Sequence, residues 1–173
     1  MQLLLAPKVS KLLKRELRKA GRREIGGLLM GEHVADGLFR VVEISVQRAG
    51  GTYACFIRRP EDHQEQLQKF FAENGNDYSR FNYLGEWHSH PSFEPAPSGT
   101  DIQSMQAMVE DPDIGANFLV LLVCRLATGG KIAATATVFR AMSEPLIVPL
   151  TLENESAAQR PSLAQRLCRI IGL

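Results

Sequence analysis

The sequence has few cysteines, and they are placed where they exclude two common kinds of site. Cys55, Cys124 and Cys168 are the three cysteines of the 173-residue chain, and they lie far apart and are odd in number. Because no Cys-x-x-Cys pair occurs, neither a zinc ribbon nor a dithiol redox motif is expected. Cys124 lies in an apolar segment and is interpreted as a small core residue.

An excess of charge and long apolar runs are also missing. The chain has 20 basic and 19 acidic residues and a formal net charge of +1, so there is no bulk attraction to nucleic acid or to an anionic membrane. No apolar run reaches the roughly 20 residues of a membrane-spanning helix. The apolar run at residues 2–6 is too short for a signal peptide. We therefore predict a cytoplasmic protein with neither nucleic acid nor a membrane among its partners.

What is present suits one compact α/β domain. Hydrophobic residues make up 45% of the chain, which is enough for a core. We expect this domain to cover residues 1–152, followed by a polar linker and an amphipathic helix within residues 153–173. Apolar periodicity and turn residues predict a short edge strand at residues 2–6 and further strands at 25–32, 38–46, 53–58, 81–88, 118–124, 131–140 and 146–152.

The same signals predict three helices in the domain. They begin at Pro7, at Pro60 and at a cap formed by Ser98 or Thr100. The first has one basic face, formed by Lys11, Lys14, Arg15, Arg18 and Lys19. We interpret this face as solvent-exposed, with docking of an acidic partner as the alternative. His63, near the second helix start, is expected to be solvated or to cap the helix.

The most informative stretch is Gly85–Asp101, which reads GEWHSHPSFEPAPSGTD. His88 and His90 are two residues apart on a predicted strand, so both imidazoles point to the same face. Pro91 then ends the strand. Asp101 lies where the next helix begins, so its carboxylate can turn back to the same point. Two imidazoles and one carboxylate suffice to hold a catalytic zinc and leave its fourth position to water.

Two further polar residues complete a recognisable pattern. Ser98 stands three residues before Asp101, and Glu24 lies upstream, directly before IGGLLMG. The order Glu24, His88-Ser89-His90-Pro91 and Ser98-x-x-Asp101 resembles the signature of the JAMM (JAB1/MPN/Mov34) metallopeptidases, over roughly residues 1–145. The resemblance implies a single MPN (JAB) domain of the cytidine deaminase-like kind, with a curved, mostly antiparallel sheet flanked by helices.

The resemblance also implies a reaction. One zinc ion would be held by His88, His90 and Asp101, Glu24 would be the general base, and Ser98 would donate to the oxyanion. Glu86, on the same strand face as His88, is a weaker candidate for the base. JAMM proteins with the full motif are zinc isopeptidases that cut after the C-terminal glycine of ubiquitin or a ubiquitin-like protein.

The amino-acid sequence of residues 83–91 is most similar to that of the small bacterial branch of the family. Its members are encoded beside E1- and E2-like enzymes in antiphage operons, including the CBASS type. The expected partners are therefore a ubiquitin-like protein or its conjugate, and E1/E2-like enzymes. Two alternatives stay open, namely a peptidase that processes a sulfur-carrier protein and a metal-free MPN scaffold.

Overall fold

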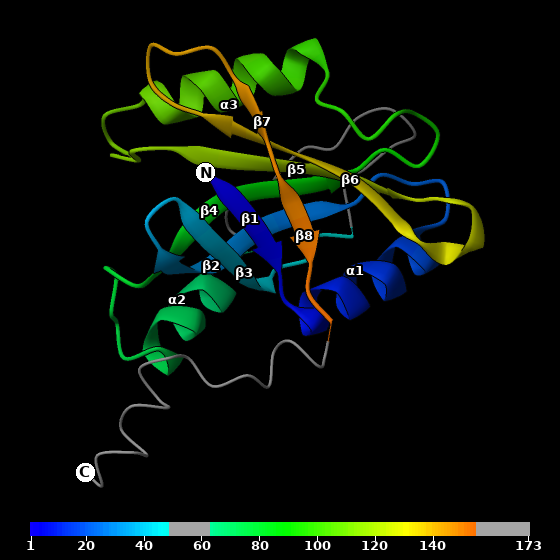
Figure 1. Cartoon of the computed structure of the whole chain (residues 1–173), viewed down its shortest axis with the longest axis horizontal. Coiled ribbons are helices and arrows are strands. Elements are labelled where there is room, and N and C mark those ends of the chain that lie inside the picture. Colours follow the sequence, from blue (N-terminus) through cyan, green and yellow to red (C-terminus); the bar gives the residue numbers. More distant parts are fainter. Residues whose placement is uncertain (49–62, 155–173) are drawn as a thin grey trace, which may run out of the picture.

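One eight-stranded sheet organises the computed structural model, which describes residues 1–48 and 63–154 (Figure 1). The strands are β1 (Gln2–Leu5), β2 (Gly26–Ala35), β3 (Leu38–Ile44), β4 (Phe81–Ser89), β5 (Leu119–Leu126), β6 (Ile132–Phe139), β7 (Leu146–Val148) and β8 (Leu150–Leu152). Their order is β7-β6-β5-β4-β2-β3-β1-β8. Four of the seven pairings are antiparallel and three are parallel. The predicted α/β class with a mostly antiparallel sheet is confirmed.

The sheet curls until its two edges meet. β7 and β8 stand at opposite ends of the strand order, yet only Pro149 separates them along the chain. The single strand predicted at residues 146–152 is therefore two strands, because a proline has no N–H to continue a ladder. The Pro149 carbonyl accepts a hydrogen bond of 2.9 Å from the Leu3 amide.

The N-terminal strand is internal rather than at an edge. β1 pairs in parallel with both β3 and β8, so the predicted edge strand is wrong. Leu3 and Leu5 are fully buried. β8, which pairs with the outer side of β1, lies almost 150 residues away along the chain. No local pattern in residues 2–6 predicts a pairing over this distance.

Three helices cover the sheet: α1 (Pro7–Ala20), α2 (Gln64–Glu73) and α3 (Gly99–Glu110). α1 packs its apolar side into a core shared with most strands, whereas α3 places Met105 and Val109 against the other face of β5. β5 is therefore buried on both faces, as its apolar run predicts. Ile102 was expected in the α3 stripe but is 38% exposed. None of the helices within the described ranges is long and apolar enough to cross a bilayer.

Two sequence-based expectations concern single buried side chains. The thiol of Cys124 is fully buried as predicted, and burial raises its pKa to about 12. His63 is buried, not solvated, and makes no side-chain cap; its Nδ1 lies 2.7 Å from Ser45 Oγ. The difference follows from the packing, because Ser45, the residue directly after β3, lies beside the start of α2 and is a polar partner for His63. The predicted strand at residues 53–58, the predicted C-terminal helix, Cys55 and Cys168 lie outside the described residues.

The basic face of α1 is exposed as predicted, but one acid lies beneath it. Glu16 is 1% exposed, and its carboxylate accepts hydrogen bonds of 3.0 Å from Arg15 Nε and 2.8 Å from Arg48 Nε. The hydrogen bond from Arg48 lowers the pKa of Glu16 against the opposing effect of burial, and Arg15 and Lys19 lower it further. A carboxyl whose pKa is lower in the folded state stabilises the fold above its unfolded pKa.

We expect Glu16→Gln to lower the free energy of unfolding by about 1–2 kcal/mol at pH 7, because a charge-assisted contact is lost from a buried site. The difference from the wild type should shrink as the pH falls below about 4.5, the ordinary value for this carboxyl. Urea unfolding from pH 7 to pH 3 measures both effects. Glu73→Gln, on an exposed residue, is the matched control, and an equal loss in both variants would contradict the prediction.

Candidate metal centre

His88 in β4 and His90 directly after it point to one face of the sheet. The side chain of Trp87 points the other way, into the α1 core, where its Nε1 donates to the Ser45 carbonyl at 2.9 Å. His88 and His90 therefore face the side on which α3 lies, as the alternation of a strand requires. The amide of His90 donates to the Cys124 carbonyl at 2.9 Å, which fixes the end of β4 beside β5.

The close pairing of β4 with β5 depends on Gly85. This residue has φ +139°, and a Cβ built there would collide with the Val120 backbone. The register of β4 against β2 also shifts at this point, between Leu29 and Met30. A glycine is thus required three residues before His88, where the strand adjusts before it reaches the site.

Asp101 enters the site through the first turn of α3. Ser98 is the N-cap, one of the two residues predicted for this position, and it forms a capping box with Asp101. The backbone N–H and the hydroxyl of Ser98 each donate to Asp101 Oδ2 at 2.7 Å. The Asp101 amide in turn donates to Ser98 Oγ at 3.2 Å. Helix capping and placement of the carboxylate are therefore achieved by the same contacts.

The three predicted ligands converge. His88 Nε2 lies 3.1 Å from His90 Nε2 and 3.5 Å from Asp101 Oδ1, and His90 Nε2 lies 3.9 Å from Asp101 Oδ2. One ligand atom from each residue lies within 4.8 Å of the others. Ligand atoms of a tetrahedral zinc with bonds of about 2.1 Å are about 3.4 Å apart. The donor set therefore fits zinc, and manganese or iron accept the same atoms.

Hydrogen bonds and nearby charges favour forms of His90 and Asp101 that can bind a cation. His90 Nδ1 lies 3.1 Å from the Glu94 carbonyl oxygen. Since a carbonyl only accepts, Nδ1 carries a hydrogen, and in the neutral imidazole the lone pair of Nε2 is the one available to a cation. Burial alone would raise the pKa of Asp101, but His88 and the hydrogen bonds from Ser98 hold that pKa well below its usual range. Asp101 is thus ionised, as a metal ligand must be.

Glu24 reaches the same site from the residue pair before β2. The Ile25 amide donates to Ser89 Oγ at 3.0 Å, and the Ser89 amide donates to the Ile25 carbonyl at 2.8 Å. With Ile25 held in the core, Glu24 faces the opposite side, toward His88 and His90. Glu24 is 4% exposed, and burial raises the pKa of its carboxyl while the two histidines act in the lowering direction. The other candidate, Glu86, is half-buried and accepts a hydrogen bond of 3.5 Å from the Tyr83 hydroxyl.

Sequence reasoning missed a support for His90. Arg125 Nη2 donates to Glu94 Oε1 at 3.1 Å, and the carbonyl of the same Glu94 accepts from His90. This contact ties the loop after β4 to the end of β5. Arg125 follows a long apolar run and shows no spacing to the histidines, so only its position directly after Cys124, the residue that pairs with Ser89, could have indicated it.

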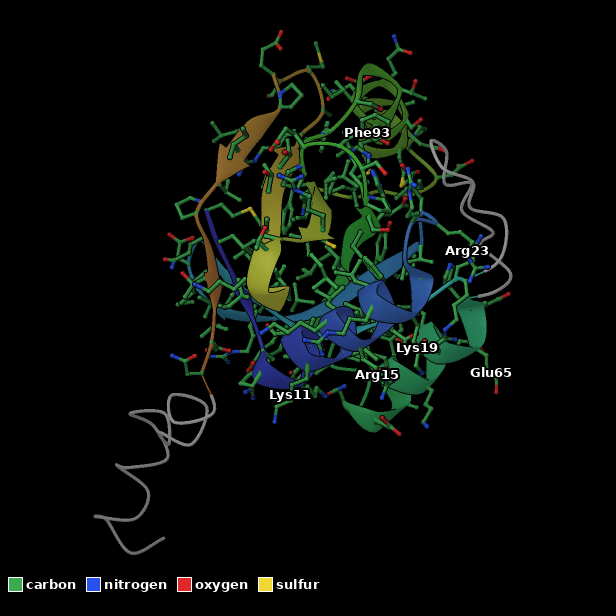
Figure 2. All side chains as sticks on the ribbon, turned by 90° about the vertical axis from the view of Figure 1, so that its right-hand side faces the viewer. Lys11, Arg15, Lys19, Arg23, Glu65 and Phe93 are labelled. Atoms are coloured by element: carbon green, nitrogen blue, oxygen red, sulfur yellow. The ribbon has the colours of Figure 1, made fainter. Side chains whose placement is uncertain are left out.

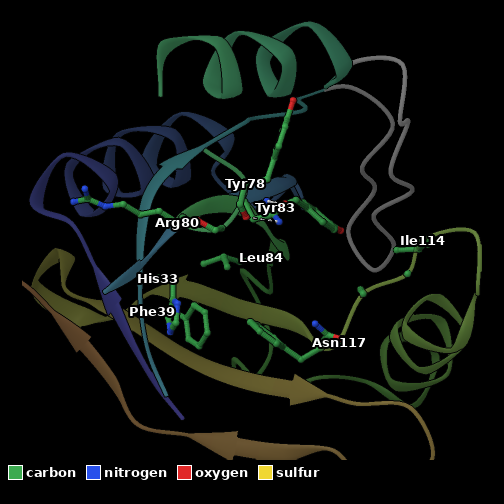
Figure 3. A pocket seen from close by; sticks show the side chains of 14 residues that line it. His33, Phe39, Tyr78, Arg80, Tyr83, Leu84, Ile114 and Asn117 are labelled. Carbon is green, nitrogen blue, oxygen red and sulfur yellow. Dashed lines mark hydrogen bonds between the residues drawn. The ribbon is translucent and has the colours of Figure 1, made fainter. Parts of the chain in front are cut away.

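A separate cavity lies away from these residues. It has a volume of about 370 Å³ and is lined by side chains that include His33, Phe39, Tyr83 and Asn117 (Figure 3). These four residues come from β2, β3, β4 and the loop before β5. None of His88, His90 and Asp101 lines it. The three candidate ligands lie at a partly open surface site, with side-chain exposures of 9%, 12% and 22%.

Two curated relatives are similar to this chain. Both are named CD-NTase/cGAS isopeptidase. The protein of Vibrio cholerae serotype O1 is 32% identical over 121 residues, which cover 68% of this chain and 73% of the relative. The protein of Enterobacter hormaechei subsp. hoffmannii is 27% identical over 126 residues, 71% of this chain and 67% of the relative.

The fold is similar to those of two solved structures, and most of the chain matches one family model. A solution structure of a protein from Desulfitobacterium hafniense shares the fold with a TM-score of 0.57 and 23% identity, over 89% of this chain and 94% of the other. One from Salinibacter ruber gives 0.51 and 20%, over 93% and 95%. The model for prokaryotic homologs of the JAB domain matches residues 7–142. The chain therefore belongs to the prokaryotic JAB-domain family, as the signature around His88 and His90 predicted.

Proposed function

We propose that this chain is a zinc-dependent isopeptidase. It cleaves after the C-terminal glycine of a ubiquitin-like protein, releasing it from a target or trimming its precursor, within a bacterial antiphage conjugation system. The observation that carries this proposal is the convergence of His88, His90 and Asp101 beside the buried carboxyl of Glu24. The names of the two relatives support an isopeptide-linked conjugate as the substrate, with a CD-NTase as a candidate component.

The proposed roles follow from the side chains present. His88 and His90 hold the zinc through Nε2, and Asp101 through its carboxylate. When bound, a zinc ion supplies Lewis-acid activation of a water molecule and of the scissile carbonyl. Glu24 takes the proton of the attacking water and later gives it to the leaving amine. Its buried position favours this role, since a raised pKa makes a carboxylate a stronger base.

Ser98 has a dual part in this proposal. Its hydroxyl has a single hydrogen, which points to Asp101 Oδ2 in the structure. On substrate binding this hydrogen turns to the oxyanion of the tetrahedral intermediate. The backbone N–H of Ser98 keeps its own contact of 2.7 Å with Asp101 Oδ2, so the carboxylate stays in place while the hydroxyl moves.

The proposal includes a cytoplasmic location and E1/E2-like enzymes as further partners. Two other functions use the same fold. A sulfur-carrier peptidase would share the metal centre but cut a linear precursor, and an MPN scaffold would hold no metal. The word isopeptidase in the relatives' names favours the first proposal over the linear substrate.

The test compares two linkages to the same tail. We expect the zinc-loaded chain to cleave a ubiquitin-like protein that is joined through its C-terminal glycine to a lysine side chain of a target, with the new C-terminus identified by mass spectrometry. A chelator should stop the reaction, because the three ligands then hold no ion. Cleavage of only the linear fusion would contradict release from a lysine side chain and would leave precursor trimming, as in the sulfur-carrier alternative. An intact conjugate in the presence of stoichiometric zinc would contradict the proposal.

A further inference from the structure

A second, smaller cavity lies where β4, β5 and α1 end. Its volume is about 200 Å³, and Arg18, Arg23 and Arg125 line it together with Ser89 and Pro91. No acidic residue is among the side chains that line it. It is also the end point of a basic row, since Lys11, Arg15 and Lys19 follow α1 and Arg23 lies beyond the helix (Figure 2).

The positive charge in this cavity is only partly neutralised. In the basic row that leads to the cavity, Arg15 and Lys19 share Glu16 at distances of 3.0 and 3.9 Å. Neither Arg18 nor Arg23 forms an ion pair within the part of the chain that the structure describes, and both side chains are exposed.

Arg125 adds an unsatisfied donor. Its Nη2 reaches Glu94 Oε1 at 3.1 Å, but its Nε is buried and has no hydrogen-bond partner among the described residues. A buried donor without a partner is uncommon in proteins and calls for an explanation. Guanidinium groups are the donors best suited to a carboxylate, which they bind through two parallel hydrogen bonds.

The cavity adjoins the metal centre through the chain itself. Arg23 directly precedes Glu24, Ser89 stands between His88 and His90, and Pro91 follows His90. Because side chains alternate along β4, Ser89 faces the α1 side while the histidines face the α3 side. The cavity and the ligands therefore lie on opposite faces of the sheet at the same end of β4. A peptide that crosses this end can contact both.

We propose that the arginine-lined cavity binds the carboxylate of an aspartate or glutamate in the protein substrate, within a few residues of the cleaved bond. This inference rests on the proposed function, since it takes the substrate to be a protein. The geometry favours a single acidic side chain over a nucleic acid. Three arginines line one small cavity, and a nucleic-acid site would instead extend along a phosphate backbone.

Binding of a defined peptide tests the proposal without any cleavage. The probe is a fluorescein-labelled hexapeptide with two adjacent glutamates, compared with the same peptide carrying glutamines. We use the zinc-loaded full chain with Glu24→Gln, so that hydrolysis does not interfere. Fluorescence anisotropy at about 0.1 M salt should show the glutamate peptide binding about 10-fold or more tightly than the glutamine peptide, as expected for charge-assisted hydrogen bonds.

The variants place the binding at the cavity. Arg18→Gln combined with Arg23→Gln should weaken binding of the glutamate peptide by about 10-fold or more. Arg140→Gln, which removes an exposed arginine that does not line the cavity, should leave it unchanged. Thermal unfolding of each variant verifies that the chain is folded. We chose Arg18 and Arg23 because a change at Arg125 would also release Glu94 from the loop that holds His90.

Three outcomes would overturn the inference. They are equal binding of the two peptides, binding that survives the double substitution, and displacement of the peptide by single-stranded DNA or inorganic phosphate at the same concentration as the peptide. The result is independent of the isopeptidase test. If the glutamate peptide binds but no conjugate is cleaved, the cavity is a carboxylate site and the proposed isopeptidase function is wrong. If a conjugate is cleaved but the peptide does not bind, the isopeptidase function stands and the carboxylate site is wrong.

Discussion

His88→Ala is expected to abolish stoichiometric metal binding. The wild-type chain should carry about one zinc ion, because two imidazoles and one carboxylate form a sufficient protein ligand set. Removing His88 leaves His90 and Asp101, whose ligand atoms are the most widely separated pair, at 3.9 Å. Two ligands so placed do not hold the ion against dialysis. Elemental mass spectrometry of the purified proteins measures the difference.

The matched control is His33→Ala. His33 is an exposed histidine in the far half of β2, stacked on Phe39, and its loss should leave the zinc content unchanged. Added zinc should also raise the unfolding temperature of the wild type and of His33→Ala but not of His88→Ala, since a ligand stabilises only the state that binds it. Equal zinc in all three proteins, or none in the wild type even when zinc is supplied, would favour the metal-free scaffold.

Glu24→Gln is expected to lower kcat/KM for conjugate cleavage by about 10²–10⁴-fold while zinc binding persists. The amide has nearly the shape of the carboxyl but does not accept a proton from water. Glu24 is almost fully buried and is not among the three ligands that converge. The change therefore separates proton transfer from metal binding. Initial rates on the isopeptide-linked conjugate, together with metal content, measure both.

Glu65→Gln provides the control for Glu24→Gln, because it makes the same chemical change on the exposed side of α2 (Figure 2). It should retain wild-type rates. If Glu24→Gln stays within about 10-fold of the wild type, Glu24 is not the general base. The base would then be sought at Glu86, which shares the strand face of His88, and Glu86→Gln would be the next variant to measure.

Parts of the metal centre were predictable because they depend on short-range geometry. The spacing of two between His88 and His90 sets a common face on any strand. The spacing of three between Ser98 and Asp101 forms a capping box at any helix start of this kind, and the structure contains it. The fold class could also be predicted, because the family signature formed by these residues is associated with one domain architecture.

Other features could not be read from local patterns. The internal position of β1 depends on pairing with β8, and Pro149 divides one predicted strand between the two edges of the sheet. His63 was expected in solvent, yet it is buried against Ser45. In each case the partner that determines the pairing or burial lies on another element. Tertiary packing therefore decides the outcome, and the neighbouring residues in the sequence do not.

The sequence by itself singled out the candidate side chains. His88, His90, Ser98 and Asp101 follow from residue type and from spacing within a strand and a helix cap, and Glu24 follows from its place in the family signature. Only the tertiary structure decided how they meet. The mutual hydrogen bonds of Ile25 and Ser89 join segments 64 residues apart and bring Glu24 to the histidines. The packing of α1 against β5 likewise gathers Arg18, Arg23 and Arg125 around one cavity. Such contacts arise from burying a shared core, and their partners are distant in the chain, so no local pattern specifies them.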